Sequence, residues 1–220
     1  MQYRPVPMSA GTILDARRDA LQDLQRRQVI HGLATSIVGK GYAATTIADI
    51  ARAARISKST VYDHFADKES VFLALHREIV AAGLAVVQQA YADSAGVAAW
   101  EERVRRVVAA YLAAMTADPV YFRVALVEVA AVSEAARLAR REAFDRYAGA
   151  MVAITTEAAA AVPGISPLTP ALALGALGGI NELILRAADD GPQAVLALEG
   201  AATDLLVRLM RDPATTTTTP

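Results

Sequence analysis

TTIADIARAARISKSTVYDHFADKESVF, residues 45–72, contains two short helical patterns separated by a turn. Thr45 or Thr46 is placed to cap the first helix and Ser57 the second, because hydroxyl side chains accept hydrogen bonds from the free N–H groups of a helix start. Asp67 begins a further helix in the same way. Apolar residues recur at the three- and four-residue spacing of one buried helix face: Ile47, Ile50, Ala51, Ala54, Ile56, Val61 and Phe65. The stretch therefore predicts a helix–turn–helix.

The same spacing leaves the polar side chains of the second helix facing outward: Lys58, Ser59, Thr60, Tyr62 and His64. Lysine and hydroxyl groups donate to phosphate oxygens, and the free N–H groups of a helix start favour anions. In a helix–turn–helix the second helix enters the major groove of DNA. The pattern indicates a DNA-binding surface, and the ordinary solvated face of a short surface helix is the alternative interpretation.

Helical periodicity continues on both sides of this stretch, and no run shows the strict alternation of a strand. A helix is predicted over 24–39, closed by GKGY at 39–42. Beyond about residue 90 longer helices are predicted over 97–116, 119–131, 134–161, 168–188 and 192–211. The predicted fold class is all-α: an N-terminal three-helix helix–turn–helix domain is joined by a fourth helix to a larger helical-bundle domain.

Composition limits the classes of function. The 220 residues are 54% hydrophobic with a net charge of −1, and without cysteine the chain forms no disulfides or thiolate zinc sites. Lys and Arg exceed Asp and Glu by ten to seven over residues 1–70, which weakly favours a polyanionic partner for that part. The longest apolar run, at 171–180, is too short to span a bilayer, and the N-terminus has no apolar signal region, so we expect a cytoplasmic protein without a membrane partner.

No enzyme signature is found. The sequence has no G-x-S-x-G, no Walker loop and no paired histidines, so we expect no catalytic residues, no metal site and no cofactor. Asp63 and His64 are adjacent and point different ways on a helix, so they form no catalytic pair.

Residues 45–72 resemble the DNA-binding segment of the TetR family of transcriptional regulators, whose pattern runs T-x-x-x-I-A-x-x-A-G-V-S-x-G-T-L-Y-x-H-F-x-x-K-E-x-L. The matching residues are Thr46, Ile50, Ala51, Ala54, Ser57, Thr60, Tyr62, His64, Phe65, Lys68 and Glu69. Three positions depart from the pattern: Arg55 and Ser59 replace glycines, and Val61 replaces a leucine. If Arg55 keeps the positive φ of the usual turn glycine, it costs about 1 kcal/mol.

The resemblance implies DNA contacts for Thr46, Ala48, Ser57, Lys58, Ser59, Thr60, Tyr62, His64 and Lys68. Lys58 and Ser59 are expected at base edges and Ala48 at a thymine methyl, while the hydroxyls, His64 and Lys68 are expected at phosphates. Arginines in and just after the N-terminal extension are candidates for a minor groove, although an ordinary charged helix surface is the better explanation of them: Arg17, Arg18, Arg26 and Arg27.

The resemblance also implies a division of the chain: an N-terminal extension at 1–23, the DNA-binding domain at 24–70, a ligand-binding and dimerisation domain at 71–211, and a disordered tail at 212–220. It implies a homodimer through helices at about 168–188 and 192–211, where Gly175, Gly178 and Gly179 allow close approach. Candidates for the ligand pocket, which core packing would also explain, are Trp100, Tyr111, Met115, Tyr121, Phe122, Arg123 and Asn181.

The function that follows from the resemblance is that of a sequence-specific transcriptional regulator. We expect a repressor that binds a palindromic operator and is released from it by a small, mainly apolar effector. The alternative is an all-helical small-molecule or lipid-binding protein without operator function. Such a carrier would leave the surface from Lys58 to Lys68 without a purpose, and its binding to DNA would lack sequence preference.

Overall fold

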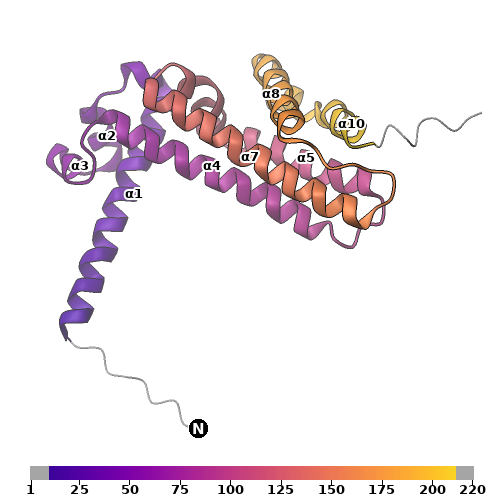
Figure 1. The fold of residues 1–220 in the computed structure, drawn as a ribbon. Helices are drawn as coiled ribbons and strands as arrows, with labels where there is room; N and C mark the ends of the chain where they lie inside the picture. Colours follow the sequence, from indigo (N-terminus) through magenta and orange to yellow (C-terminus); the bar gives the residue numbers. More distant parts are fainter. Residues whose placement is uncertain (1–9, 212–220) are drawn as a thin grey trace, which may run out of the picture. The chain divides into compact units, whose positions relative to one another are not determined.

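The computed structural model describes residues 10–211, which belong to two compact units, Met1–Leu75 and His76–Pro220 (Figure 1). Every regular element in residues 10–211 is a helix, and the only pairing of strand type there is an isolated bridge between Ile165 and Arg211. The predicted all-α class is confirmed. The start of the N-terminal extension and the tail at 212–220, which was expected to be disordered, lie outside the described residues.

Unit 1 contains α1 (Ala10–Ala44), α2 (Ile47–Ala54), α3 (Lys58–His64) and the start of α4 (Lys68–Asp93). The first helix is longer than the predicted 24–39, because the extension is already helical from Ala10. Leucine, alanine, arginine and glutamine, which favour helices, make up most of residues 16–28. The helix is broken at Gly41, whose φ of 78° is accessible mainly to glycine.

The caps of α2 and α3 are the predicted ones. Thr46 accepts a hydrogen bond from the Asp49 N–H, and Asp49 accepts one from the Thr46 N–H in return, which forms a capping box. Ser57 accepts from the Thr60 N–H at the start of α3. At the start of α4, Asp67 accepts from the Ser70 N–H at 2.7 Å. Local hydrogen bonds thus set where each of these helices begins.

Close packing of α1 on α2 depends on Gly32. A Cβ atom at this position would lie 2.6 Å from the Ile50 carbonyl oxygen and 2.9 Å from the Ala54 Cβ. Glycine at this position therefore lets the two helices approach. The buried core of the unit comes from all four helices and includes Val29, Leu33, Ile37, Ile50, Val61, Phe65, Val71 and Phe72.

Unit 2 contains the rest of α4 and the following elements: α5 (Trp100–Ala117), α6 (Pro119–Phe122), the π-helix η1 (Arg123–Val127), the 3₁₀-helix η2 (Glu128–Ala130), α7 (Glu134–Ala161), α8 (Pro170–Ala187), the 3₁₀-helix η3 (Ala188–Asp190), α9 (Pro192–Leu196) and α10 (Glu199–Met210). The bounds of α7 are those predicted. In this unit α5 and α7 run alongside α4 (Figure 1), and the three helices share one hydrophobic core with α8.

Two predicted helices of unit 2 are wrong as single elements. The segment 119–131 changes from α to π to 3₁₀ geometry, and Arg123 and Glu128 at the two ends of the π turn form an ion pair of 3.0 Å. The segment 192–211 is two helices, because the chain turns at Ala197 and Leu198, and Leu198 packs against the core. Gly200 follows this turn, and its low helix propensity does not favour one continuous helix through it.

Two segments, Lys68–Asp93 and Pro170–Asp190, are long and apolar enough to cross a membrane by length and composition. The longest apolar run, at 171–180, is shorter than either segment and did not predict them. More than half of the apolar window of α4 is buried inside the fold, which accounts for its composition. The window that contains α8 is only 33% buried, so its apolar face needs another explanation.

Candidate functional site

The outward face of α3 carries the side chains that the sequence predicted. Lys58 and Ser59 are exposed, and Tyr62 is 56% exposed, which is unusual for an aromatic side chain. Val61, on the opposite face, is completely buried. Thr60 and His64 are half-buried at the edges of the same face. Five of the predicted residues therefore lie together on α3.

A hydroxyl cluster occupies the start of α3. The Ser57 Oγ lies 2.6 Å from the Ser59 Oγ and 2.9 Å from the Thr60 Oγ1. It also accepts the Thr60 N–H at 3.0 Å. Because Ser57 acts as the cap, its oxygen is held in place and fixes the orientation of its two neighbours. Ser59, which replaces the usual glycine of the family pattern, is thereby held at the exposed surface.

The turn between α2 and α3 is built on Arg55 in a left-handed conformation, with φ 57° and ψ 41°. It is the only residue other than glycine with positive φ among residues 10–211. Its N–H donates to the carbonyls of Ala51 and Arg52, which closes α2. The turn geometry expected from the family pattern is thus present although arginine replaces glycine.

Thr46 and Ala48 lie in the first turn of α2, beside an acidic group. The Thr46 hydroxyl is exposed and donates to Asp49 at 2.6 Å, while Ala48 is half-buried. Asp49 also pairs with Lys40 and Arg52 at 2.5 and 3.0 Å. These hydrogen bonds, with that of Lys40 the strongest, hold the pKa of Asp49 below its ordinary value. The carboxylate thus stays charged and keeps the start of α2 fixed.

Two of the predicted phosphate contacts already have protein partners. The Lys68 ammonium donates to the carbonyls of Tyr42 and Thr45 at 2.9 and 2.8 Å, and it lies 4.1 Å from the centre of the Tyr42 ring. The His64 Nε2 lies 3.2 Å from the Gln25 Oε1. Gln25 was not predicted, since no local pattern connects it with a residue 39 positions away. Lys68 joins the end of α1 to the start of α4.

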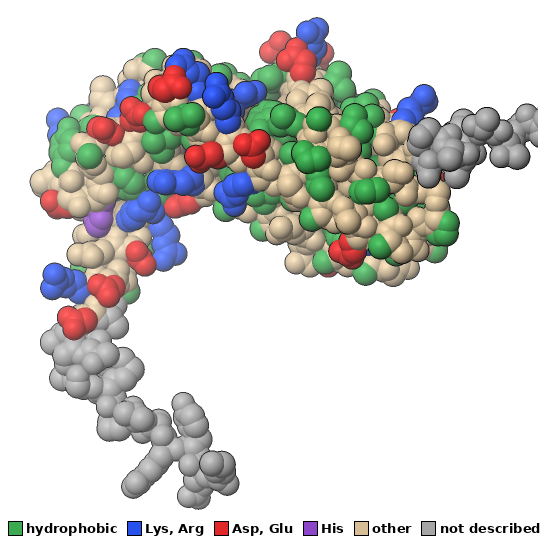
Figure 2. All heavy atoms as spheres, in the orientation of Figure 1, with side chains coloured by type: hydrophobic (Ala, Val, Ile, Leu, Met, Phe, Trp, Pro, Cys, Tyr) green, Lys and Arg blue, Asp and Glu red, His purple; other side chains and the backbone are tan. Residues whose placement is uncertain are grey.

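The extension ahead of residue 24 carries both signs of charge. Figure 2 shows acidic and basic side chains interspersed along the N-terminal part of α1. Arg17, Arg18 and Arg27 are exposed there, and the Arg26 guanidinium lies 5.1 Å from the centre of the Phe65 ring. The surface of the N-terminal part of α1 is therefore not strongly basic.

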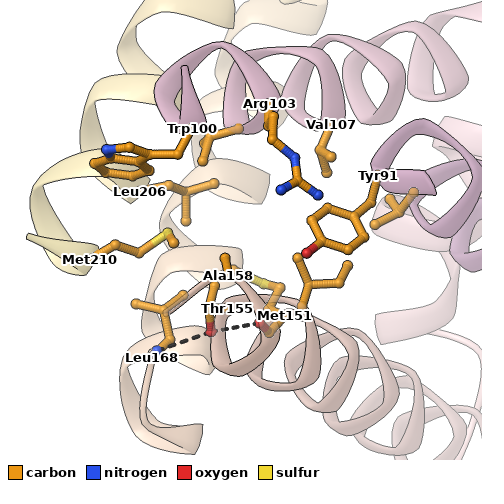
Figure 3. A pocket seen from close by; sticks show the side chains of 13 residues that line it. Tyr91, Trp100, Arg103, Val107, Met151, Thr155, Ala158, Leu168, Leu206 and Met210 are labelled. Carbon is orange, nitrogen blue, oxygen red and sulfur yellow. Dashed lines mark hydrogen bonds between the residues drawn. The ribbon is translucent and has the colours of Figure 1, made fainter. Parts of the chain in front are cut away.

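Unit 2 contains a cavity of about 70 Å³ between α4, α5, α7 and α10 (Figure 3). Carbon atoms make up nearly all of its accessible wall. Of the predicted pocket residues only Trp100 lines it. The other lining residues are Val87, Tyr91, Arg103, Val104, Val107, Met151, Ile154, Thr155, Ala158, Leu168, Leu206 and Met210. They come from distant parts of the chain, so no sequence motif indicated them.

The lining of this cavity also includes polar side chains. Figure 3 shows the Arg103 guanidinium beside Tyr91, and its carbon lies 4.5 Å from the centre of the ring. The Thr155 hydroxyl donates to the Met151 carbonyl and accepts the Leu168 N–H at 3.0 Å (Figure 3). Burial raises the pKa of Tyr91, and Arg103 and Glu157 both interact with its hydroxyl.

Four other predicted pocket residues line a separate cavity of about 20 Å³: Tyr111, Met115, Tyr121 and Asn181. The Tyr111 hydroxyl donates to the Asn181 Oδ1 at 2.6 Å, and the hydroxyls of Tyr121 and Tyr147 lie 3.2 Å apart. Burial raises the pKa of Tyr111 well above its ordinary value. The volume suffices for about one water molecule. Phe122 and Arg123 lie outside the linings of both cavities.

One face of α8 is apolar and exposed. Leu172, Leu174 and Leu183 are each about 40% exposed. Cβ atoms added at Gly175, Gly178 or Gly179 would meet nothing within 4 Å. The glycines predicted to allow close approach thus face away from the core of their own unit.

Among residues 10–211 no group of three or more histidine and acidic side chains is arranged to hold a metal ion.

Comparisons with known proteins agree with this architecture. The family model of the bacterial regulatory proteins of the TetR family matches residues 30–75. A comparison with curated protein sequences gives no match. Among solved structures, the fatty acid degradation regulator FadR from Bacillus halodurans is similar with a TM-score of 0.71 and 20% identity, over 83% of this chain and 94% of that one.

Two further structures are similar over most of their length. The transcriptional regulator FadR from Bacillus subtilis, in complex with stearoyl-CoA, has a TM-score of 0.68 and 20% identity over 84% of this chain and 99% of that one. A protein from Mesorhizobium loti MAFF303099, described as a TetR-family transcriptional regulator, has a TM-score of 0.69 and 17% identity over 87% of this chain and 98% of that one. The chain therefore has the fold of these solved regulators, and its residues 30–75 match the model of the bacterial regulatory proteins of the TetR family.

Proposed function

We propose that this protein is a sequence-specific DNA-binding transcriptional regulator. The observation that carries the proposal is the outward face of α3, where Lys58, Ser59 and Tyr62 are exposed within the segment that matches the TetR-family model. A lysine, hydroxyls and a phenol on one helix face suit contacts with phosphates and base edges. The helix is held from behind by the buried Val61 and by the turn at Arg55.

The proposed contacts with DNA follow the family pattern, and exposure decides which of them reach base edges. Lys58 and Ser59 are assigned to base edges, since they are the most outward residues at the start of α3. Ala48 is assigned to a thymine methyl. The remaining contacts are with phosphates and comprise Thr46, Ser57, Thr60, Tyr62 and His64. We take Lys68 out of this set, because its ammonium group is already hydrogen-bonded to the carbonyls of Tyr42 and Thr45. His64 stays in it, because its contact with Gln25 uses Nε2 and leaves the Nδ1 of the ring for a phosphate.

We further propose that two copies associate through α8 and the segment formed by α9 and α10, and that the dimer binds a palindromic operator. Support comes from the exposed leucines of α8 and from glycines without neighbours in their own chain. Apolar helix faces of this kind are usually covered in soluble proteins, and a two-fold dimer covers the same face on both copies. A dimer reads two half-sites, which accounts for a palindrome.

The protein is proposed to act as a cytoplasmic repressor that a small, mainly apolar molecule releases from DNA. The carbon-lined cavity of unit 2 supports this, and the FadR from Bacillus subtilis is in complex with stearoyl-CoA. A ligand that prefers a conformation with wrongly spaced recognition helices weakens DNA binding by the ratio of its affinities for the two conformations.

The experiment that tests the DNA-binding function is selection of bound sequences from a random pool, followed by titration of the selected DNA at two salt concentrations. A palindrome with half-sites about one or more helical turns apart is expected. Lys58→Ala should weaken binding and relax the preference at one position of each half-site. Arg141→Ala, which removes an exposed positive charge from α7, is the matched control. Binding without sequence preference would contradict the proposal.

A further inference from the structure

The smaller cavity of unit 2 has a polar lining without carboxylates. Its polar lining residues come from α4, α5, α6, α7 and α8 and are His76, Tyr111, Tyr121, Arg140, Tyr147 and Asn181. No aspartate or glutamate of residues 10–211 lines it. It shares no lining residue with the carbon-lined cavity, so the two are separate sites.

Arg140 brings an unpaired donor to this lining. Its Nε is buried and has no hydrogen-bond partner between residues 10 and 211. The guanidinium carbon lies 4.5 Å from the centre of the Phe144 ring, which lines the same cavity. Folded proteins rarely leave a buried N–H unpaired, and the cost is larger for a charged group. An acceptor inside the cavity would remove this cost.

Asn181 and a pair of tyrosines supply two further donors. The Asn181 Oδ1 accepts from the Tyr111 hydroxyl at 2.6 Å, which leaves the amide NH₂ group of this buried side chain for another acceptor. The hydroxyls of Tyr121 and Tyr147 lie 3.2 Å apart. Whichever of the two donates, the hydrogen of the other remains. Both donors therefore lack an acceptor among residues 10–211.

The charges that act on this lining are positive. Burial lowers the pKa of His76 to about 4, and the charge of Arg77 adds to this effect. Burial raises the pKa of Tyr147 well above its ordinary value, while Arg146 lowers it. No carboxylate contributes to either shift. An anion in the cavity would thus meet Arg140 without a competing negative charge.

The number of donors favours an anion over a water molecule. A water molecule would bring two more hydrogens into a lining whose donors already lack acceptors, whereas a halide ion only accepts. The volume of about 20 Å³ exceeds the roughly 10–15 Å³ that a water needs. It is much smaller than the carbon-lined cavity of about 70 Å³, so it has no room for an alkyl chain.

We propose that this cavity binds a small monovalent anion of the size of chloride. The ion accepts hydrogen bonds from the Arg140 Nε and from the Asn181 amide. Because Arg140 belongs to α7 and Asn181 to α8, the ion ties these two helices together and stabilises unit 2. The inference does not rest on the proposed binding of DNA or of an apolar effector, since it follows from the lining of this cavity alone.

Thermal unfolding in sodium chloride and in sodium gluconate of equal ionic strength tests the proposal. Gluconate is too large for the cavity, so it serves as the reference for each protein. An ion that binds only the folded state raises Tm. At a chloride concentration ten times the dissociation constant, Tm should be about 3–5 °C higher than in gluconate.

Three variants assign the effect to the cavity. Arg140→Met removes the cation, and Asn181→Asp keeps the oxygen that accepts from Tyr111 but replaces the donor by a carboxylate. Both should lose the rise in Tm with chloride. Arg141→Met changes the next residue of α7, an exposed arginine outside the lining, and should retain the rise. An equal rise in all four proteins would overturn the proposal, because general salt effects act on all of them alike.

Crystals of the unmodified protein grown with sodium bromide locate the ion without any variant. Bromide scatters anomalously, and a peak is expected in the cavity beside the Arg140 Nε. Peaks at the protein surface only, or no rise of Tm with chloride in the unmodified protein, would overturn the proposal and assign the cavity to water. None of these measurements involves DNA, so failure of the anion site and failure of the DNA-binding function are told apart.

Discussion

The Lys68 ammonium donates to the Tyr42 carbonyl at 2.9 Å and lies 4.1 Å from the centre of the ring of the same residue. It also donates to the Thr45 carbonyl at 2.8 Å. A lysine in this position holds together two segments that are 23 to 26 residues apart in the sequence. The family pattern alone does not distinguish this role from a contact with phosphate.

Lys68→Met should therefore lower the free energy of unfolding of unit 1, by about 1–3 kcal/mol, because the carbonyls it bonds lose a charged donor. Lys58→Met replaces an exposed lysine and should leave the free energy of unfolding almost unchanged while it weakens operator binding. Urea denaturation and DNA titration of both variants check the contrast. If Lys68→Met is as stable as the unmodified protein, the structural role is refuted.

Arg55→Gly should stabilise the protein by about 0.5–1 kcal/mol, because glycine adopts the left-handed conformation of this turn without steric cost. Ala53→Gly, two residues earlier inside α2, should destabilise it by about 1 kcal/mol. Thermal unfolding of the two variants gives the comparison. A loss of stability in Arg55→Gly would mean that the arginine side chain contributes more than its backbone conformation costs.

Gly32→Ala should destabilise unit 1 by about 1–3 kcal/mol, since the new Cβ would lie 2.6 Å from the Ile50 carbonyl oxygen and push α1 away from α2. Gly39→Ala makes the same change further along α1, where nothing lies within 4 Å of the added atom. It should stabilise the helix by up to about 1 kcal/mol. In denaturant titrations the free energy of unfolding should be lower for Gly32→Ala and higher for Gly39→Ala than for the unmodified protein. Equal effects of the two changes would contradict the close approach of α1 and α2.

Gly179→Arg should convert a dimer into monomers and abolish tight operator binding, because it places a charge on the proposed interface of α8. The added side chain meets nothing in its own chain, so the fold of the protomer should persist. Gly149→Arg introduces the same residue at an exposed glycine of α7, also without neighbours, and should leave the dimer intact. Analytical ultracentrifugation distinguishes the two. If the Gly179→Arg variant is still a dimer, the interface does not include this face of α8.

His76 should make the stability of unit 2 depend on pH. Burial, and secondarily the charge of Arg77, lowers its pKa from 6.5 to about 4. Between these values the unfolded chain binds a proton that the folded chain does not, so the stabilising contribution is complete above pH 6.5 and is lost as the pH falls toward 4. The expected slope is about 1.4 kcal/mol per pH unit at most.

His76→Gln should remove this slope, whereas His31→Gln, at an exposed histidine of α1, should retain it. Denaturant titrations from pH 7 to pH 4 measure both. An identical pH dependence in His76→Gln and the unmodified protein would show that other groups cause the loss of stability.

Local patterns predicted the helix–turn–helix because its ends are fixed by neighbouring residues. Thr46, Ser57 and Asp67 act through hydrogen bonds to residues three positions away, and such bonds can be inferred from the sequence. The left-handed turn at Arg55 followed from the family pattern. The bounds of α7 could be predicted equally well, since Ser133 caps its start and its apolar residues keep the helical period.

Of the cavity in unit 2 the sequence predicted only Trp100, because the other lining residues come from helices that lie far apart in the sequence. Tyr91, Arg103, Met151 and Leu206 carry no pattern that marks them as neighbours. Tyr111 and Asn181, chosen for their residue types, pair with each other instead of lining that cavity.

The amino-acid sequence by itself determined the helical class, the positions of the caps and the outward face of α3, since all of these depend on interactions within a few residues. The tertiary structure decided which residues enclose the cavity, why Gly32 is needed and what Lys68 bonds. These depend on packing between segments far apart in the chain, where shape and burial are set by the whole unit and leave no local trace.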